Sequence, residues 1–202
     1  MTLHDNAYAA FMLDYAAGVL TPAERLAADL HRALSPEGGR NAHVLEAVGG
    51  AILERIGPLP TRYFDTPRLG SQEASGNRSS LLDPYLNRDL LALNWRKDIF
   101  GVKTLPTSIP TASLLRLDPS ERAPSHLHGR RDVTVVLLGA YADEFGAYER
   151  GDIAFAEPGL KHQPRAEGDK PCVCLLATEA GRPLQGFLGL FGLGDSKPRQ
   201  VS

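Results

Sequence analysis

Four side chains that could bind a metal ion lie in two short segments of the second half of the chain. His126 and His128 are separated by one residue, and Asp132 follows four residues later. His162 ends a downstream segment that begins at Gly151. On an extended strand, side chains at i and i+2 point to the same face, so two imidazoles can share one ion. Three imidazoles and a carboxylate suit zinc, iron, manganese or nickel. We therefore predict one divalent metal ion, with zinc preferred, held by these four residues.

These histidines could instead be surface residues or residues that hydrogen-bond within the fold. Three of the six histidines in the chain fall in the two segments, however, and glycines bracket each segment. This concentration of imidazoles favours the metal site over the simpler alternative.

Two other pairs of residues could carry chemistry. Cys172 and Cys174 lie in one short apolar segment, where cysteines are more often small buried hydrophobic residues than redox sensors. Arg130 and Arg131, between the candidate ligands, could bind an anionic effector, but a solvated turn is the simpler interpretation.

The candidate ligands would be carried by short β-strands. After residue 81 the sequence shows apolar or alternating runs, separated by proline, glycine and aspartate at fairly even spacing. The runs are residues 112–117, 133–138, 153–156 and 172–177. Several short strands with regular turn signals are typical of an antiparallel sandwich or barrel.

The first part of the chain, residues 1–57, has helical periodicity instead. A first helix ends at Gly18, and Thr21 and Glu24 form a capping box for a second helix with Pro22 at its first position. A third helix is predicted over residues 41–56, where the glycines at 49 and 50 would permit close approach of another helix. The apolar faces are Tyr8, Phe11, Met12 and Tyr15 in the first helix; Ala23, Leu26, Ala27, Leu30 and Leu34 in the second; and Val44, Leu45, Val48 and Ile52 in the third.

Three short helices make a thin hydrophobic core. A domain of this size is marginally stable alone, and its apolar faces exceed what three helices can bury among themselves. These faces would therefore pack against a partner protein, the β-domain or a second copy of the chain. We predict an α+β protein with a helical domain at 1–57, a linker rich in proline, glycine and polar residues at 58–79, and a metal-binding β-domain at 80–202.

The two metal-binding segments resemble the two sequence motifs of the cupin family. They read His126-x-His128-x3-Asp132-x6-Gly139 and Gly151…Pro158-Gly159-x2-His162. The resemblance implies an antiparallel cupin β-barrel, or jelly roll, around one metal ion. Two positions depart from the family pattern: an aspartate stands at 132, where most cupins have glutamate, and Glu157 stands where proline is usual.

Both parts of the chain together resemble the ChrR family of anti-sigma factors. The similar segments are Leu-Asp-Tyr-Ala-Ala-Gly-Val-Leu at 13–20, His31, Ala-Val-Gly-Gly at 47–50, Asn-Trp-Arg at 94–96, Gly-Asp-Ile at 151–153 and Cys-Val-Cys-Leu at 172–175. In that family a helical domain clamps a sigma factor of the extracytoplasmic-function (ECF) type, and a cupin lies behind it. The resemblance implies a transcriptional regulator that sequesters an ECF-type sigma factor through its N-terminal helices, with a metallo-cupin that responds to oxidative stress.

Members of that family hold a second zinc ion in the helical domain, through an early histidine and a His-x3-Cys-x2-Cys motif. His4 and His31 match the two histidines, but Ser35 and Gly38 stand at the two cysteine positions. Two imidazoles with a chance carboxylate make a poor structural zinc site. We therefore predict no zinc in the helical domain and expect both histidines to hydrogen-bond within it.

The alternative function is a metallo-cupin enzyme, a dioxygenase or an isomerase, whose helices serve as a dimerisation module. Apart from Glu144 and Glu157, no further acid–base residue accompanies the ligands in their segments. We therefore assign no catalytic residue and no other cofactor-binding residue, and we predict a regulatory protein that could form a homodimer. Metal analysis separates the two functions, because an oxygenase needs iron with open coordination positions.

Composition limits the partners and the location of the chain. The 202 residues carry a formal net charge of −2, so no basic field attracts nucleic acid or anionic lipid. No apolar run approaches the ~20 residues that span a bilayer, and the first residues lack a signal peptide's features. Neighbouring cysteines at 172 and 174 are a poor disulfide pair. We expect a cytoplasmic protein that contacts neither membrane nor nucleic acid directly.

Overall fold

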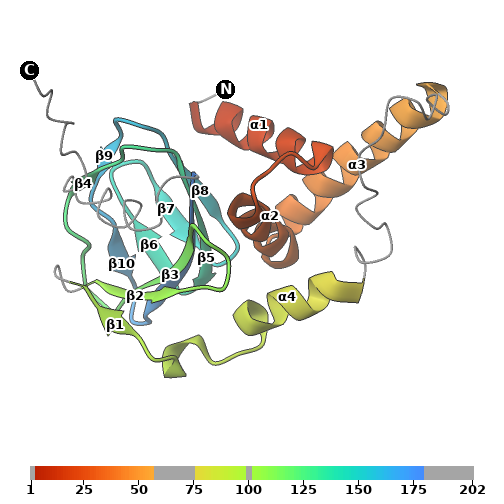
Figure 1. The fold of residues 1–202 in the computed structure, drawn as a ribbon. Coiled ribbons are helices and arrows are strands. Elements are labelled where there is room, and N and C mark those ends of the chain that lie inside the picture. Colours follow the sequence, from red (N-terminus) through yellow and green to blue (C-terminus); the bar gives the residue numbers. More distant parts are fainter. Residues whose placement is uncertain (1–2, 57–75, 99–101, 180–202) are drawn as a thin grey trace, which may run out of the picture.

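The first two N-terminal helices lie against one face of an antiparallel sheet in the computed structural model, and the third packs on these two helices (Figure 1). The structure describes residues 3–56, 76–98 and 102–179. Residues 57–75, which contain most of the predicted linker, lie outside the described residues. Within the described ranges, no helix has the length and apolar character needed to cross a membrane. The predicted α+β class is confirmed.

The N-terminal helices begin and end at recognisable signals. Helix α1 spans Leu3–Ala17, α2 spans Pro22–Leu34 and α3 spans Pro36–Ile56. The predicted capping box is present: the Glu24 N–H donates to Thr21 Oγ1 (3.3 Å), and the Glu24 carboxylate accepts the Thr21 N–H (3.1 Å). Helix α3 begins at Pro36 and not at residue 41. The reason is that Ser35 Oγ accepts the Gly38 N–H (3.3 Å), and proline at a first helical position needs no N–H bond.

Two helical elements precede the barrel strands. Helix α4 spans Gly76–Leu86, and a short 3-10 helix, η2, spans Leu90–Ala92. The expectation of strands directly after residue 81 is wrong for this segment. Local hydrogen bonds explain η2, because the Asp89 carboxylate accepts the Leu91 N–H (3.0 Å) and the Trp95 indole N–H donates to the Leu90 carbonyl (3.0 Å). Helix α4 contacts α2, so this connection returns the chain from the helices to the barrel.

The strands form a barrel of three antiparallel sheets (Figure 1). The largest has the order β1-β2-β3-β11-β5-β8, and the smaller ones are β10-β6-β7 and β4-β9. The bounds are β1 Arg96–Lys97, β2 Lys103–Pro106, β3 Ala112–Leu117, β4 His126–Leu127, β5 Asp132–Leu138, β6 Ala140–Ala142, β7 Ala147–Glu149, β8 Ile153–Ala156, β9 Lys161–His162, β10 Arg165–Glu167 and β11 Cys172–Thr178. All four apolar runs singled out in the sequence are strands of the six-stranded sheet.

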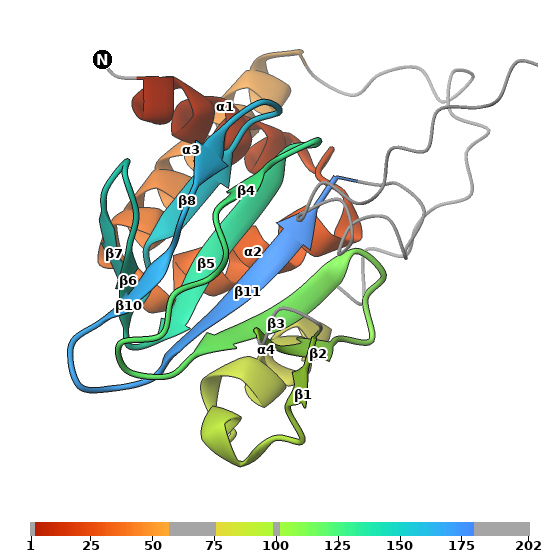
Figure 2. The same ribbon diagram turned by 90° about the vertical axis from the view of Figure 1, so that its left-hand side faces the viewer.

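The central strands β5 and β11 of the six-stranded sheet are buried on both faces, and their side chains alternate between the two. Val173 and Leu175 of β11 belong to a core shared with the helices, whereas Cys172 and Cys174 face the barrel interior. Strand β5 follows the same pattern, with Val136 turned into the barrel. Figure 2 shows the helices behind this sheet, on the side away from the smaller strands. Helices and barrel therefore share one continuous hydrophobic core.

The apolar faces of α1 and α2 pack against the barrel. Phe11 is 1% exposed, and its ring meets the ring of Phe155 in β8 edge-on, with centroids 5.3 Å apart. Leu26 and Leu30 are buried in the same core. Of the three occupants that the sequence left open for these faces, the structure places the β-domain there. A surface for a partner protein must be sought elsewhere on the helices.

The packing predicts a large difference between two neighbouring residues of α1. Phe11→Ala should lower the free energy of unfolding by about 3–5 kcal/mol, because it leaves a cavity between helix and sheet. Leu13→Ala, on the exposed side of the same helix, should change it by about 0.5 kcal/mol or less. Urea denaturation followed by circular dichroism measures both, and equal effects would contradict the shared core.

Candidate metal centre

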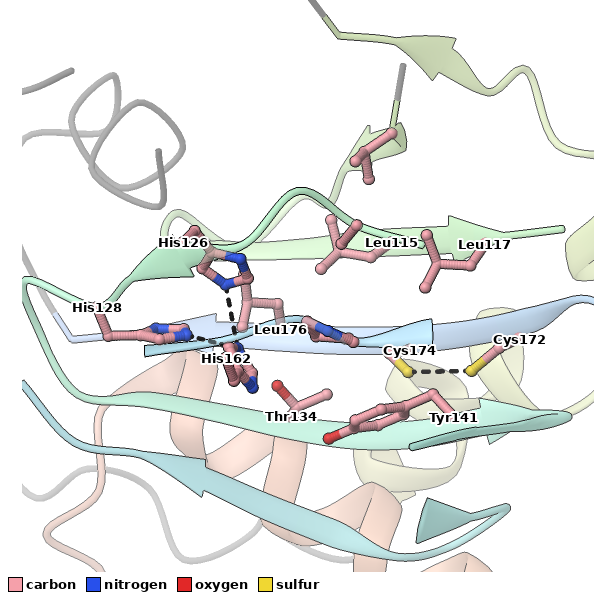
Figure 3. A pocket seen from close by; sticks show the side chains of 13 residues that line it. Leu115, Leu117, His126, His128, Thr134, Tyr141, His162, Cys172, Cys174 and Leu176 are labelled. Carbon is pink, nitrogen blue, oxygen red and sulfur yellow. Dashed lines mark hydrogen bonds between the residues drawn. The ribbon is translucent and has the colours of Figure 1, made fainter. Parts of the chain in front are cut away.

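Three of the four predicted ligands converge at one end of the barrel (Figure 3). His126 in β4 lies directly opposite His162 in β9, and His128 follows β4. The Nε2 atom of His162 lies 2.8 Å from that of His128 and 3.1 Å from that of His126. The pairing of two short strands thus gathers residues that are more than thirty positions apart.

The other ring nitrogen of each histidine is held by an acceptor. His126 Nδ1 donates to the Pro124 carbonyl (2.9 Å), and His128 Nδ1 donates to the Asp132 carboxylate (2.7 Å). His162 Nδ1 donates to the carboxylate of Asp143 (2.8 Å). Because these acceptors have no proton to give, each neutral ring carries its hydrogen on Nδ1 and its lone pair on Nε2.

In this tautomer the three Nε2 lone pairs face one another at short distances. This arrangement is repulsive unless a cation lies among them. Burial lowers the pKa of His126 to about 4, and the nearby rings of His128 and His162 also lower it, against the opposing effect of the Pro124 carbonyl. His126 is therefore neutral at pH 7, which is the form that binds metal. The donor set fits one divalent ion of the kind that imidazoles bind.

Asp132 takes a different place from its three partners. One carboxylate oxygen, Oδ2, accepts the His128 Nδ1 hydrogen, and the carboxylate is not in the group of converging ligand atoms. Its other oxygen, Oδ1, is buried without a hydrogen-bond partner among the residues that the structure describes. Asp132 thus orients the ring of His128 through Oδ2, while Oδ1 accepts no hydrogen bond from the described residues.

Asp143 is a residue that the sequence analysis missed. It sits in the turn between β6 and β7, where Oδ1 accepts the N–H groups of Phe145 and Gly146 (2.9 and 3.1 Å). Burial alone would raise the pKa of this carboxyl, but hydrogen bonds from His162 and from the two N–H groups outweigh it and lower the pKa. An aspartate two residues before a Phe-Gly pair signals a turn. It does not signal contact with a histidine nineteen positions away.

The rest of the barrel interior is apolar. Behind the three histidines, the cavity is lined by Leu115, Leu117 and Leu176, with Tyr141 and the two cysteines at its far end (Figure 3). The Cys172 and Cys174 sulfur atoms lie 3.6 Å apart and are buried. Their mutual hydrogen bond, together with burial, raises the pKa of Cys174 well above its usual value. A protonated thiol is a weak nucleophile and a poor ligand, so this pair behaves as apolar lining.

In the helical part, His31 joins a hydrogen-bonded relay. The Asn41 amide donates to Tyr8 Oη (3.0 Å), and the Tyr8 hydroxyl donates to His31 Nε2 (3.1 Å). His31 Nδ1 donates to the Gly151 carbonyl of the barrel (2.7 Å). A Cβ at Gly38 would lie 2.6 Å from the His31 ring, so the ring fills the place of a side chain there. The expected hydrogen bonding of His31 is found, but one bond reaches the barrel. The side chain of His4 lies outside the described residues, and the absence of zinc here stays a prediction.

Comparisons with known proteins match both parts of the chain. The family model for the ChrR cupin-like domain matches residues 97–181. The anti-sigma-E factor ChrR of Cereibacter sphaeroides is 32% identical over 204 residues, which cover 93% of this chain and 95% of that protein. The crystal structure of Rhodobacter sphaeroides SigE in complex with the anti-sigma ChrR is similar at 32% identity and a TM-score of 0.66, over 85% of this chain and 96% of that chain. A Cupin 2 conserved barrel domain protein from Salinispora arenicola matches 50% of this chain and 93% of its own, at 17% identity and a TM-score of 0.39.

The relay predicts a pH dependence of stability that belongs to His31. Burial lowers its pKa, while the Gly151 carbonyl, Asp152 and Glu37 oppose the shift. Below about pH 6.5 the unfolded chain therefore binds the proton more readily than the folded chain, and stability falls as the pH drops. The free energy of unfolding should be steady above pH 7. Between pH 6.5 and 5 it should decline with a His31 contribution of at most about 1.4 kcal/mol per pH unit.

The control for this prediction is another histidine of the same helical part. His31→Gln should flatten the decline relative to the unmodified chain, whereas His43→Gln should leave it unchanged, because His43 is exposed on α3. Denaturation curves at several pH values give the comparison. Parallel profiles for the His31 variant and the unmodified chain would show that the relay does not require a neutral ring.

Proposed function

The chain belongs to the family of ChrR anti-sigma factors, and on this premise we propose that it sequesters an ECF-type sigma factor through its N-terminal helices. The observation that carries the proposal is the similarity to a ChrR protein in complex with SigE, which extends over helices and barrel alike. In this proposal the protein is a cytoplasmic regulator that acts through a protein partner. Its formal charge of −2 offers no general attraction to nucleic acid.

The exposed side of α3 offers the docking surface. Val44, Val48 and Ile52 lie at i, i+4 and i+8, and between 52 and 57% of each residue is exposed. A side chain added at Gly49 or Gly50 would meet no atom within 4 Å. The close helix approach expected at these glycines thus has no partner within the described part of the chain. An apolar stripe beside two glycines lets a partner's backbone come close, and we assign that place to the sigma factor.

A substitution at Gly49 separates binding from folding. Gly49→Leu should stabilise the chain by roughly 0.5–1 kcal/mol, because a mid-helix glycine is replaced by a good helix former in open space. The same side chain should block the partner and weaken sigma-factor binding about tenfold or more. Calorimetric titration with the cognate sigma factor measures affinity, and transcription from its promoter measures inhibition.

The matched controls lie on the same helix and on the barrel. Val48→Asp should also weaken binding, while Phe145→Asp, an equally exposed apolar residue in the β6–β7 turn, should bind normally. If Gly49→Leu and Val48→Asp both bind as tightly as the unmodified chain, α3 is not the docking surface.

For the barrel, we propose one divalent metal ion, with zinc preferred, held by His126, His128 and His162. Asp132, the fourth residue predicted from the sequence, would support the site by orienting the His128 ring through its Oδ2 atom. The support is the set of three Nε2 lone pairs with their Nδ1 atoms already engaged. A bound cation supplies the positive charge that this arrangement of lone pairs requires. The histidines and their carboxylate partners serve to hold and orient, and no residue is assigned a catalytic role.

The metal proposal predicts graded effects of substitution. The purified full-length chain should contain about one metal ion, and His128→Ala or His162→Ala should abolish it because two imidazoles hold an ion poorly. Asp132→Asn should bind about 10–100-fold more weakly, which is the usual effect of losing an orienting carboxylate. His43→Ala should bind normally. Elemental analysis and competition with a chelator measure these effects. Full metal occupancy in the His128 variant would show that His128 is not a ligand.

The alternative function, a metallo-cupin enzyme, can be tested with the same purified proteins. Family membership indicates a regulatory protein, so we expect zinc and no turnover. A chain that forms no complex with any ECF-type sigma factor of its source, yet turns over a small substrate in a way that depends on His126, would establish the enzyme.

A further inference from the structure

Arg131 stands next to the metal centre in sequence and next to the helices in space. It directly precedes Asp132, whose carboxylate holds His128. Its own carbonyl accepts the Glu179 N–H (3.0 Å), so its backbone is fixed where β5 begins. The solvated turn expected for this arginine from the sequence is wrong, because the side chain leaves the loop and reaches helices α1 and α2.

On the side of α2, Arg131 binds the residue that caps the helix. Its guanidinium donates to Glu24 Oε1 (3.2 Å), and only 12% of the Glu24 side chain is exposed. The other carboxylate oxygen, Oε2, accepts the N–H and the hydroxyl of Thr21 (3.1 and 2.8 Å). One carboxylate therefore joins the N-terminus of α2 to the loop that carries the metal-site residues.

On the side of α1, the Arg131 guanidinium lies over the ring of Phe11, 5.9 Å from its centroid. Phe11 is buried against Phe155 in β8, whose strand pairs with β5. A partly desolvated cation over an aromatic face is attracted to it. Arg131 thus touches both helices that pack on the sheet.

The contacts of Arg131 are incomplete in one respect. Its Nε atom is buried and has no hydrogen-bond partner among the described residues. An unsatisfied buried donor is unfavourable, so the present arrangement of this guanidinium is less stable than a fully hydrogen-bonded one would be.

We propose that Arg131 is the positioning residue that couples the three-histidine site to helices α1 and α2. This coupling would be the means by which the metal site regulates sigma-factor binding, and in that sense it rests on the proposed function. When a cation holds the His128 ring, the Asp132 carboxylate is fixed, and Arg131 stays paired with Glu24. When the ring is released, Asp132 can reorient. The adjacent Arg131 then loses its fixed geometry, and the N-terminal turn of α2 loses protection.

The test compares zinc-loaded and chelator-stripped full-length chains by hydrogen–deuterium exchange with mass spectrometry. In the unmodified chain, zinc should slow amide exchange in peptides from α1 and α2 by about fivefold or more, in the range of ordinary coupling between sites. Arg131→Gln should bind zinc at the same stoichiometry but show no zinc-dependent change in these peptides. If Arg131 has only a structural role, Arg131→Gln should change amide exchange equally in the zinc-loaded and the stripped chain. The zinc-dependent difference would then be unchanged.

Glu24→Gln provides an independent variant. Glutamine can still accept the Thr21 N–H and preserve the capping box, but it lacks the charge that pairs with Arg131. Glu24→Gln should lose the zinc-dependent difference in amide exchange, as Arg131→Gln does. The double variant should show the same loss as either single variant. Arg165→Gln removes the same charge from an exposed pair with Glu167 on β10 and should behave as the unmodified chain. Arg131→Lys should restore part of the response.

Two outcomes overturn the coupling. One is an unmodified chain whose helices exchange equally with and without zinc, and the other is a full zinc response in Arg131→Gln and Glu24→Gln. A sigma-factor titration in both metal states is a separate measurement. If the unmodified chain binds no sigma factor in either state, the proposed function fails, while the exchange data still decide whether Arg131 couples metal site and helices.

Discussion

Burial of both faces of one sheet is the constraint on which the rest of this structure depends. Strand β11 is buried along its whole length, from Cys172 to Thr178, because helices cover one face and the barrel interior lies on the other. Exposing either face would place buried, mainly apolar side chains in water, which is unfavourable in proportion to the apolar area exposed. The helices thus cover one face of the barrel sheet and also carry the candidate docking surface for a partner.

Apolar packing alone would leave the helices free to shift on this sheet, because the hydrophobic effect has no direction. Two polar contacts remove that freedom. His31 binds the Gly151 carbonyl before β8, and Arg131 binds Glu24 from the start of β5. Gly151 has a φ of +96°, and a Cβ there would lie 3.0 Å from the Leu34 carbonyl, so the close approach requires glycine. Since β5 and β8 are neighbours, both contacts register the helices on the same edge of the sheet.

The features that the sequence predicted well are those set by neighbouring residues. The capping box at Thr21 and the four apolar strands depend on short-range spacing, and all are present. The convergence of three histidines was predicted from the spacing of His126 and His128 and from the donor types, and the family resemblance supported it. The relation of Asp132 to His128, in contrast, depends on which carboxylate oxygen meets which ring nitrogen, and strand periodicity does not carry that information. Asp143 was missed, and the surface that covers Phe11 was left open, because both depend on contacts between segments far apart in the chain.

The loss of two cysteines changes how the helical part is held together. In a small zinc domain the free energy of metal binding is part of the free energy of folding. Here position 38 has no side chain, and the His31 ring occupies the adjacent space with both nitrogens engaged. Without zinc, as predicted from the sequence, the helical part would gain its order from the sheet that α1 and α2 cover. A helical part with its own metal can be regulated at that metal, whereas one ordered by its barrel would be regulated through the barrel, as we propose for Arg131. The contacts of Arg131 with Glu24 and of His31 with the Gly151 carbonyl join the helices to the barrel.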